Sequence, residues 1–368
     1  MNENKFTRKY LQDAKHLIDL NSPYSGRVSW ESPSNIALVK YWGKYGDQLP
    51  QNPSLSFTLK HSKTKTSIDY QHRDGNQSNV DFYFEGKRNE KFEAKISRYI
   101  EKISAYMPFL SQLQLKIDSA NTFPHSAGIA SSASSFSALA LCLCSMEKKY
   151  FGTLQSDDEF YQKASFLARL GSGSACRSTY GKLALWGKTD AISNSSNEVA
   201  IPVDNGINPV FKSYHDAILI IDSGQKELSS TGGHALMENH KYAYTRYNQA
   251  QENLKSILAH LQSGNEAGFA QVVENEAMSL HALMMSSIPS VVLLKPNTLV
   301  AIERLKEFRL KENINFTFTL DAGPNIHILY PQSVCEQMVR FIESNLLNLC
   351  ENGRWIDDEI SVGPTQIE

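Results

Sequence analysis

The sequence predicts an α+β protein of two domains, and three observations carry that prediction. A chain of 368 residues is too long to fold around one hydrophobic core of ordinary size, and it is long enough for two domains. Strand-like and helix-like segments occur in both halves, without the regular alternation of a doubly wound parallel fold. Residues 193–208, rich in serine, asparagine and glycine, have the composition of a linker. We therefore expect an N-terminal extension over residues 1–26, a first domain over 27–205 and a second over 206–368.

The first half is predicted to mix strands with two helices. Period-two alternation predicts strands at residues 27–30, 54–59, 65–70, 80–84 and 113–117. Isoleucines at three- and four-residue spacing predict a helix over 92–107. A loop of small residues then leads into a helix over 130–150 with one apolar face. Residues 10–20 are open to two interpretations, an amphipathic helix and a frayed terminus.

The second half is predicted to be mainly helical around one hairpin. Residues 217–222 form an apolar strand-like run. Helical periodicity predicts four helices, over residues 235–261, 266–286, 297–311 and 333–347. Between the last two, residues 314–320 alternate as a half-buried strand, and 326–330 resume the pattern after a Gly-Pro break.

Composition excludes several classes of protein. A net charge of -2 lacks the basic excess that nucleic-acid binding requires, so no nucleic-acid partner is expected. No apolar stretch approaches the length of a membrane-spanning helix, and residues 1–22 lack the apolar core of a secretory signal. The five cysteines show neither a C-x-x-C pair nor metal-ligand spacing, which indicates reduced structural thiols. We expect a cytoplasmic protein without a membrane partner.

Asp321 is the most informative single residue. The tripeptide Asp321-Ala322-Gly323, followed by Pro324-Asn325, places a carboxylate on the turn between the two hairpin strands. A carboxylate there can reach a ligand, although an isolated acid on a turn is more often a turn-former. A functional interpretation therefore needs positive charge and a phosphate site elsewhere in the chain.

The loop over residues 124–133 supplies a candidate phosphate site. It places a glycine and a series of small residues immediately before a helix, where backbone N–H groups, serine hydroxyls and the helix dipole together favour an anion. It is not a Walker A loop, which ends in Gly-Lys-Ser/Thr. Two interpretations stay open: a phosphate site, and a helix merely capped by Ser131 or Ser132.

Two further segments supply positive charge. Lys40 and Lys44 lie four residues apart beside aromatic residues, and a lysine ammonium suits phosphate and keeps a neighbouring carboxylate ionised. Their alternative interpretation is a solvated pair on the surface. Residues 171–178 form a glycine-serine segment that contains Arg177, whose guanidinium can bind a carboxylate or phosphate with two hydrogen bonds. The alternative here is a flexible loop.

Taken together, these segments resemble a known group of enzymes. The pattern Pro124-x-x-x-Gly128-x-x-Ser131-Ser132-Ala133 is similar to the phosphate loop of the GHMP small-molecule kinases. Combined with residues 35–44, 171–178 and 321–325, it resembles the mevalonate diphosphate decarboxylase family in particular. The resemblance covers roughly residues 27–331 and extends to the final predicted helix, whereas the first 25 or so residues are an extension outside it.

The resemblance implies a fold and an activity. The implied fold is the two-domain GHMP-kinase fold, with an N-terminal domain like domain 2 of ribosomal protein S5 and a C-terminal ferredoxin-like α/β sandwich. The implied reaction uses ATP and Mg²⁺ to phosphorylate the tertiary 3-hydroxyl of mevalonate 5-diphosphate, after which phosphate and CO₂ leave and isopentenyl diphosphate remains. A homodimer is implied as well.

The resemblance also implies residue roles. Asp321 would orient or deprotonate the 3-hydroxyl, and Lys40 would keep Asp321 charged and stabilise the phosphoryl group. The implied substrate-binding residues are Tyr41, Lys44, Ser172, Ser174, Arg177, Ser230 and Thr231, with Arg177 and Ser174 on the substrate carboxylate. The implied ATP-binding residues are Asn121, Gly128, Ala130, Ser131 and Ser132, with Ser132 also at Mg²⁺.

Some features depart from this pattern or leave it open. An arginine that the family usually carries around residues 81–84 is not evident. His234, His281 and His327 lack metal-ligand spacing, which favours core or surface roles. Three rival functions remain: decarboxylation of mevalonate 5-phosphate, phosphorylation of the 3-hydroxyl without decarboxylation, and a non-catalytic GHMP-fold nucleotide sensor.

Overall fold

The computed structural model describes residues 4–19, 24–73, 79–124, 129–224 and 230–368. Its larger sheet has the strand order β14-β1-β4-β7-β5-β6, with β8 paired to β4 and β9 to β8. These strands are β1 (Ser25–Ala37), β4 (Ser54–His72), β5 (Asn79–Phe84), β6 (Lys87–Arg88), β7 (Leu113–Asn121), β8 (Leu183–Trp186), β9 (Ala200–Pro202) and β14 (Thr365–Gln366). Only β5 and β7 pair in parallel among the described strands of this sheet.

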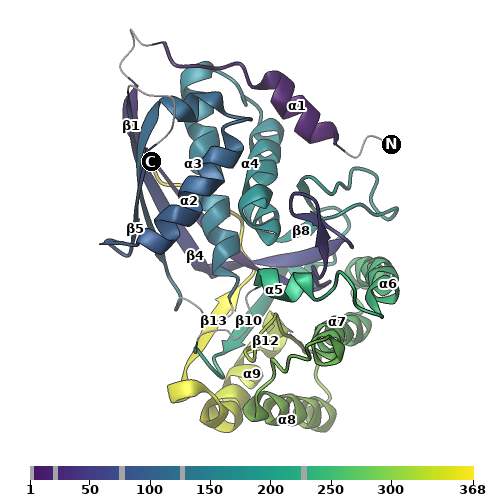
Figure 1. Ribbon diagram of the computed structural model, residues 1–368. Helices are drawn as coiled ribbons and strands as arrows, with labels where there is room; N and C mark the ends of the chain where they lie inside the picture. The colour runs from purple at the N-terminus through teal and green to yellow at the C-terminus, as the bar shows by residue number, and fades with distance from the viewer. Residues whose placement is uncertain (1–3, 20–23, 74–78, 125–128, 225–229) are drawn as a thin grey trace.

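The second sheet has the order β11-β12-β10-β13. Its strands are β10 (Tyr214–Leu219), β11 (Thr317–Thr319), β12 (Ile326–Pro331) and β13 (Trp355–Glu359), and a separate small hairpin joins β2 (Lys44–Tyr45) to β3 (Leu49–Pro50). Strands β11 and β12 are the predicted hairpin, which is confirmed. The two sheets lie in different parts of the molecule, each with its own helices (Figure 1), so the mixed two-domain fold is confirmed.

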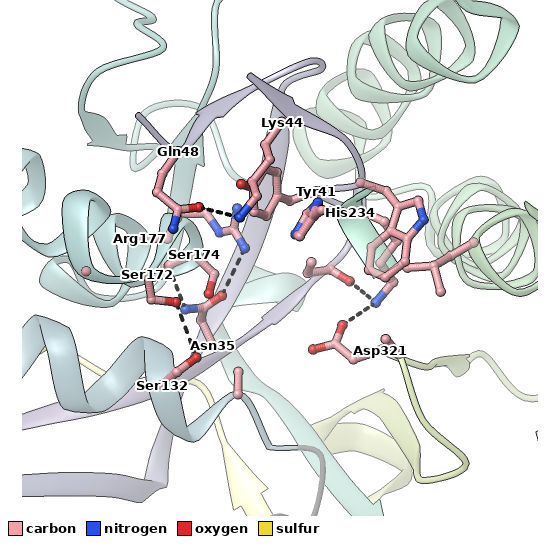
Figure 2. Close-up of a pocket in the computed structure, with 18 of the residues that line it drawn as sticks. Asn35, Tyr41, Lys44, Gln48, Ser132, Ser172, Ser174, Arg177, His234 and Asp321 are labelled. Carbon is pink, nitrogen blue, oxygen red and sulfur yellow. Dashed lines mark hydrogen bonds and ion pairs between the residues drawn. The ribbon is translucent and has the colours of Figure 1, made fainter. Parts of the chain in front are cut away.

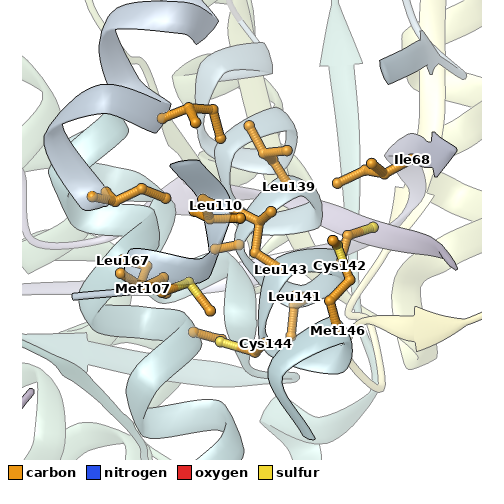
Figure 3. Close-up of a cluster of buried hydrophobic side chains, with 14 of the residues drawn as sticks. Ile68, Met107, Leu110, Leu139, Leu141, Cys142, Leu143, Cys144, Met146 and Leu167 are labelled. Atoms are coloured by element: carbon orange, nitrogen blue, oxygen red, sulfur yellow. The ribbon is translucent and has the colours of Figure 1, made fainter. Parts of the chain in front are cut away.

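Three helices cover one face of the larger sheet: α2 (Glu90–Ile103), α3 (Ser131–Phe151) and α4 (Asp157–Gly171). Helix α2 begins where the Asn89 side chain accepts a hydrogen bond from the Phe92 N–H, which satisfies a donor that the first turn leaves open. Helix α3 runs through the middle of the layer and is buried on nearly all sides, as its long apolar run requires. Figure 3 shows its leucines and cysteines packed among neighbouring apolar side chains.

Five helices accompany the second sheet (Figure 1): α5 (Ser230–Ala235), α6 (Ala243–Ser263), α7 (Glu266–Ser286), α8 (Pro296–Glu312) and α9 (Cys335–Phe341). The predicted single helix over 235–261 is wrong, because the chain turns between α5 and α6. In that turn the Tyr242 N–H donates to His240 Nδ1 (3.1 Å), a local bond that replaces the continuous helical pattern. Helix α9 is shorter than predicted because its last turns change to a π-helix over Ile342–Leu346.

The beginning of the described chain forms helix α1 (Lys5–Asp13), earlier than the segment considered for a helix. Its Tyr10 side chain is buried in the core of the first domain. The Glu198 carboxylate accepts hydrogen bonds from the N–H groups of Phe6 and Thr7, both at 2.8 Å, and so caps the helix from a distant part of the chain. This cap depends on tertiary structure, which explains why the local sequence did not reveal it.

Several strands lie outside the sequence prediction, and β9 and β14 are two of them. Strand β9 falls inside the linker-like stretch and extends the first sheet through β8. Strand β14 brings the end of the chain back to β1, where Gln366 pairs with Trp30. The boundary near residue 205 stays a prediction. In the described parts of the chain, no helix is both long and apolar enough to cross a membrane, and the five cysteines, all of them described, form no disulfide.

Candidate active site

A cavity of about 410 Å³ collects most of the residues that the sequence singled out (Figure 2). Its walls come from the segment after β1, the start of α3, the end of α4 with the following 3₁₀ helix, helix α5 and the turn after β11. Nine of the predicted site residues line it: Lys40, Tyr41, Lys44, Ala130, Ser132, Ser172, Ser174, Arg177 and Asp321. Lys40 and Asp321, 281 positions apart in sequence, thus share one site, because the second domain docks beside the β1–β2 connection of the first.

Lys40 and Asp321 form an ion pair across this cavity. The Lys40 Nζ lies 3.0 Å from Asp321 Oδ1, with the lysine side chain 1% exposed and the aspartate 29% exposed. The ammonium also donates to the Ala37 carbonyl oxygen at 2.6 Å. Burial lowers the Lys40 pKa, and the attraction of Asp321 opposes that shift. The surface interpretation of Lys40 is therefore wrong, and Asp321 faces a cavity rather than only closing a turn.

Helix α7 fixes the backbone of Lys40. The Glu276 carboxylate accepts the Lys40 N–H at 2.8 Å and is itself paired with the buried guanidinium of Arg246. Asn253 also donates to Glu276 (2.6 Å), and Asn52 donates to the Lys40 carbonyl oxygen (2.9 Å). Sequence reasoning missed this support, because no local pattern reveals that a carboxylate in one domain will meet a backbone amide in the other.

Arg177 is a buried cation, and some of its N–H donors have no hydrogen-bond partner among the described residues. Its side chain is 2% exposed, and its Nη2 donates to Asn35 Oδ1 at 3.3 Å. Its Nε and Nη1 have no hydrogen-bond partner among the described residues, and no described carboxylate lies within ion-pair distance. Burial accordingly lowers the Arg177 pKa. Unpaired buried donors on a cation are costly in a fold and favourable towards an incoming anion.

The segment that carries Arg177 is the 3₁₀ helix Gly173–Thr179, so the flexible-loop interpretation is wrong. The Asn35 amide donates to the Ser174 carbonyl oxygen (3.2 Å) and to Ser178 Oγ (2.8 Å), which ties the helix to β1. Gly173 is required for close packing, since a Cβ there would lie 2.8 Å from the Tyr41 hydroxyl. Arg177 thus sits on a rigid support.

The start of α3 forms the opposite wall of the cavity. Ala130, with φ of +36°, is the residue before the first turn, and no side chain in the described residues caps that turn. Neither Ser131 nor Ser132 caps the helix, so that alternative is wrong. Ser132 Oγ instead lies 3.2 Å from Ser172 Oγ, with both facing the cavity (Figure 2). Open N–H groups at a long helix's start favour an anion.

The remaining predicted binding residues fall into two groups. Asn121 and Ser131 do not line the cavity. Asn121 accepts a hydrogen bond from Thr64 Oγ1 (2.8 Å), and the Thr64 hydroxyl oxygen lies 2.6 Å from that of Ser134 in the first turn of α3. Gly128 lies outside the described residues. The backbone of Ser230 and Thr231 begins α5, and their side chains lie outside the described part as well.

Sequence reasoning missed one cation in the cavity wall. Lys95, from α2, lines the cavity near the start of α3, with its ammonium 5.0 Å from the centre of the Phe136 ring. It adds a positive charge to the cavity wall. Within the described ranges, no three His, Cys, Asp or Glu side chains gather as a metal site. The hydroxyl of Ser132 fits a Mg²⁺ that takes most of its oxygen ligands from phosphate and water.

Two buried histidines should make the protein sensitive to acid. Burial lowers the pKa of His281 to about 4 and of His234 to about 3, from an ordinary 6.5. At a pH between the lowered pKa of each histidine and 6.5, the unfolded chain binds a proton there that the folded chain does not. The free energy of unfolding therefore falls as the pH drops below 6.5. At pH 5 each buried histidine lowers the free energy of unfolding by about 2 kcal/mol relative to its value at high pH.

We therefore expect the melting temperature to fall less between pH 7 and pH 5 in His281→Leu than in the parent protein. The matched control is His61→Leu, at an exposed position, which should follow the parent. Thermal unfolding at several pH values measures the difference. Parallel curves for parent and His281→Leu would contradict the neutral, buried state of His281.

Comparisons with known proteins agree with this geometry. Two family models match, the diphosphomevalonate decarboxylase-like N-terminal domain over residues 32–197 and the mevalonate 5-diphosphate decarboxylase C-terminal domain over residues 217–360. The diphosphomevalonate decarboxylase of Gibberella zeae is 30% identical over 336 residues, which cover 85% of this chain and 83% of that one.

Solved structures are similar over nearly the whole chain. The mevalonate diphosphate decarboxylase of Staphylococcus aureus is 28% identical with a TM-score of 0.79, covering 94% of this chain and 99% of that one. A complex of MDDEF with MVAPP, AMPPCP and magnesium is 26% identical with a TM-score of 0.78, covering 94% and 100%.

Proposed function

The chain belongs to the mevalonate diphosphate decarboxylase family, and from this membership we propose that it converts mevalonate 5-diphosphate and ATP to isopentenyl diphosphate, ADP, phosphate and CO₂. Its two-domain fold is of the GHMP type. The observation that best supports the proposal is the buried Lys40–Asp321 pair, placed in one cavity with the partly unpaired Arg177. The reaction requires a carboxylate that orients or deprotonates the hydroxyl, a cation that stabilises the phosphoryl group, and a second cation that binds the substrate's carboxylate.

The reaction has two stages, and the proposed roles follow from the charges. In the first, Asp321 orients the 3-hydroxyl or takes its proton, the hydroxyl oxygen attacks the γ-phosphorus of ATP, and ADP leaves. In the second, the new phosphate leaves with the electron pair of its C–O bond. The electrons of the bond to the carboxyl carbon then form the C=C bond, and CO₂ departs. Lys40 stabilises the phosphoryl group at arrival and at departure.

The ATP side of the site fits the start of α3. Ser132, Ser172 and the uncapped helix start supply donors for the phosphates, and Lys95 supplies charge. When bound, Mg²⁺ neutralises phosphate charge during transfer. We propose Ser132 as the chain's contact to that ion, and Gly128 and Asn121 as supports of the loop.

The substrate side fits the two remaining cations. Arg177 with Ser174 would bind the carboxylate, and Lys44 with Tyr41 the diphosphate. The Tyr41 hydroxyl is buried without a partner in the described residues, and Lys44 pairs only with the Gln48 amide oxygen at 3.0 Å among them. A role for Ser230 and Thr231 at the diphosphate stays a proposal from resemblance, as does the homodimer. The unpaired cysteines support the proposed cytoplasmic location.

The experiment that tests the function follows all four products. Purified protein is given ATP, Mg²⁺ and either mevalonate 5-diphosphate or mevalonate 5-phosphate, and ADP, phosphate, CO₂ and the isoprenoid product are measured. We expect all four with the diphosphate, at a kcat/KM well above that for the monophosphate. Preference for the monophosphate, ADP without CO₂, or binding without ADP would each select one of the three rivals.

Replacing Arg177 should separate binding from folding. We expect Arg177→Met to raise the KM for mevalonate 5-diphosphate about 100-fold, because two hydrogen bonds between charged groups are lost. The melting temperature of the unliganded protein should not fall, because a partly unpaired buried charge is removed and its volume is kept. Steady-state kinetics and thermal unfolding measure both. A lower melting temperature with an unchanged KM would make Arg177 a structural residue only.

A further inference from the structure

His234 lines the active-site cavity, although its spacing in the sequence favoured a core or surface role. The side chain is 7% exposed and comes from α5. Its ring lies against Tyr41, with ring centres 4.2 Å apart, and against Trp42, at 5.0 Å. Figure 2 shows the ring beside Tyr41 in the cavity wall. The two aromatic contacts hold its plane in one orientation.

A backbone hydrogen bond fixes the tautomer of His234. The Gly43 N–H donates to His234 Nδ1 at 3.0 Å, so Nδ1 is the unprotonated nitrogen. Gly43 has φ of +95°, and a Cβ there would lie 2.3 Å from the Tyr247 hydroxyl, so this backbone conformation depends on glycine. In a neutral imidazole with Nδ1 as acceptor, the proton is on Nε2.

The imidazole is neutral. Burial, with a smaller contribution from the nearby Lys44 ammonium, lowers the His234 pKa to about 3. No described residue accepts a hydrogen bond from its Nε2. Unlike the Tyr41 hydroxyl, which is fully buried, the Nε2 atom keeps some exposed surface. The ring therefore presents one fixed, uncharged N–H donor to the cavity.

Lys44 determines what that donor will meet. Its ammonium is half-buried in the same wall, and among the described residues no carboxylate lies within ion-pair distance of it. Because Lys44 and His234 line the same cavity and the Lys44 charge acts on the imidazole, an anion bound by Lys44 would lie near the His234 ring. Phosphate oxygens carry more lone pairs than one lysine can use, so a neighbouring N–H donor finds an acceptor there.

We propose that His234 is a substrate-binding residue whose Nε2–H donates to an oxygen of the substrate's diphosphate beside Lys44. This inference rests on the proposed function and extends its binding site by one residue. A neutral donor adds directional affinity for the phosphate group without adding a further positive charge to a cavity that already holds Lys40, Lys44 and Arg177.

Two substitutions at His234 separate the two ring nitrogens. In His234→Asn, the amide oxygen occupies roughly the place of Nδ1, so the bond from Gly43 can persist while the outer donor is lost. In His234→Gln, the amide nitrogen reaches roughly the place of Nε2, so the donor is kept and the bond from Gly43 is lost. Titration calorimetry then gives the Kd of mevalonate 5-diphosphate and, as a control, of Mg²⁺-ATP.

We expect His234→Asn to bind mevalonate 5-diphosphate about tenfold more weakly than the parent, as loss of one hydrogen bond to a charged group requires. His234→Gln should recover most of that loss, and Mg²⁺-ATP should bind all three proteins alike. The reverse order, with Asn close to the parent and Gln weak, overturns the proposal in favour of a purely structural bond to Gly43. Equal Kd values for the substrate overturn it too.

The same measurements keep this inference apart from the proposed function. A parent protein that binds mevalonate 5-diphosphate but releases no CO₂ contradicts the function, while the order of the Kd values still decides the role of His234. A parent that turns over the substrate while all three proteins bind it equally contradicts only the role of His234.

Discussion

The Asp321→Asn variant should lose turnover by a factor of about 10³ while both substrates still bind. General-base or orienting groups contribute factors of about 10² to 10⁴, and a tertiary alcohol is a crowded nucleophile that depends on such help. Asparagine keeps the size of the side chain and an oxygen for the Lys40 ammonium, now 3.0 Å from Asp321 Oδ1. What it removes is the negative charge and the ability to take a proton.

Turnover is measured as ADP and CO₂ release, and substrate binding by calorimetry on the same preparation. Asp222→Asn is a matched control, because Asp222 is an aspartate outside the cavity lining whose N–H donates to Asn325 at the base of the same turn. Its backbone bond survives the substitution, and it should keep turnover within a few-fold of the parent. A fully active Asp321→Asn enzyme would rule out both proposed roles of this carboxylate.

The Lys40→Met variant should show a loss of similar size. Methionine keeps the length and apolar stem of lysine, so the packing of the buried side chain changes little. The lost ammonium is the cation that pairs with Asp321, and in the proposed reaction it stabilises the phosphoryl group at both stages. The Glu276 contact uses the backbone N–H of residue 40 and should persist, so the fold should be retained.

Comparison with Lys44→Met makes this prediction specific. Lys44 is four residues away in the same wall, and we expect its loss to raise the KM for the diphosphate substrate more than it lowers kcat. Loss of Lys40 should act on kcat. If the two variants change kcat and KM in the same proportions, Lys40 is another binding cation rather than part of the chemistry.

Local pattern was enough to predict some of the elements that carry the site. Alternation predicted the hairpin of β11 and β12 around Asp321, and helical periodicity predicted α7 at the residues where it occurs. The loop before α3 was recognised as a phosphate site or a cap; the structure rules out the cap, and the phosphate site stays a proposal. In these cases neighbours in sequence determine the structure.

The sequence could not reveal contacts that exist only after the domains dock. Glu276 is one glutamate on a long helix until its carboxylate meets the Lys40 N–H. His234 is one histidine after a serine-rich segment until Gly43 fixes its tautomer. Lys95 faces the cavity only because α2 packs beside the start of α3. Family resemblance brought Lys40, Arg177 and Asp321 into one hypothesis, and their distances came from the structure.

Helix α7 has a consequence for protein engineering. Its Glu276 accepts a hydrogen bond from the backbone N–H of Lys40, and its Leu280 lines the same cavity as Asp321. Helix α7 therefore packs against the surroundings of both residues of the ion pair. A substitution that displaces this helix is expected to move Lys40 and Asp321 together. Efforts to change the substrate range should leave α7 intact and vary Lys44, Gln48 and His234, which line the cavity on other segments of the chain.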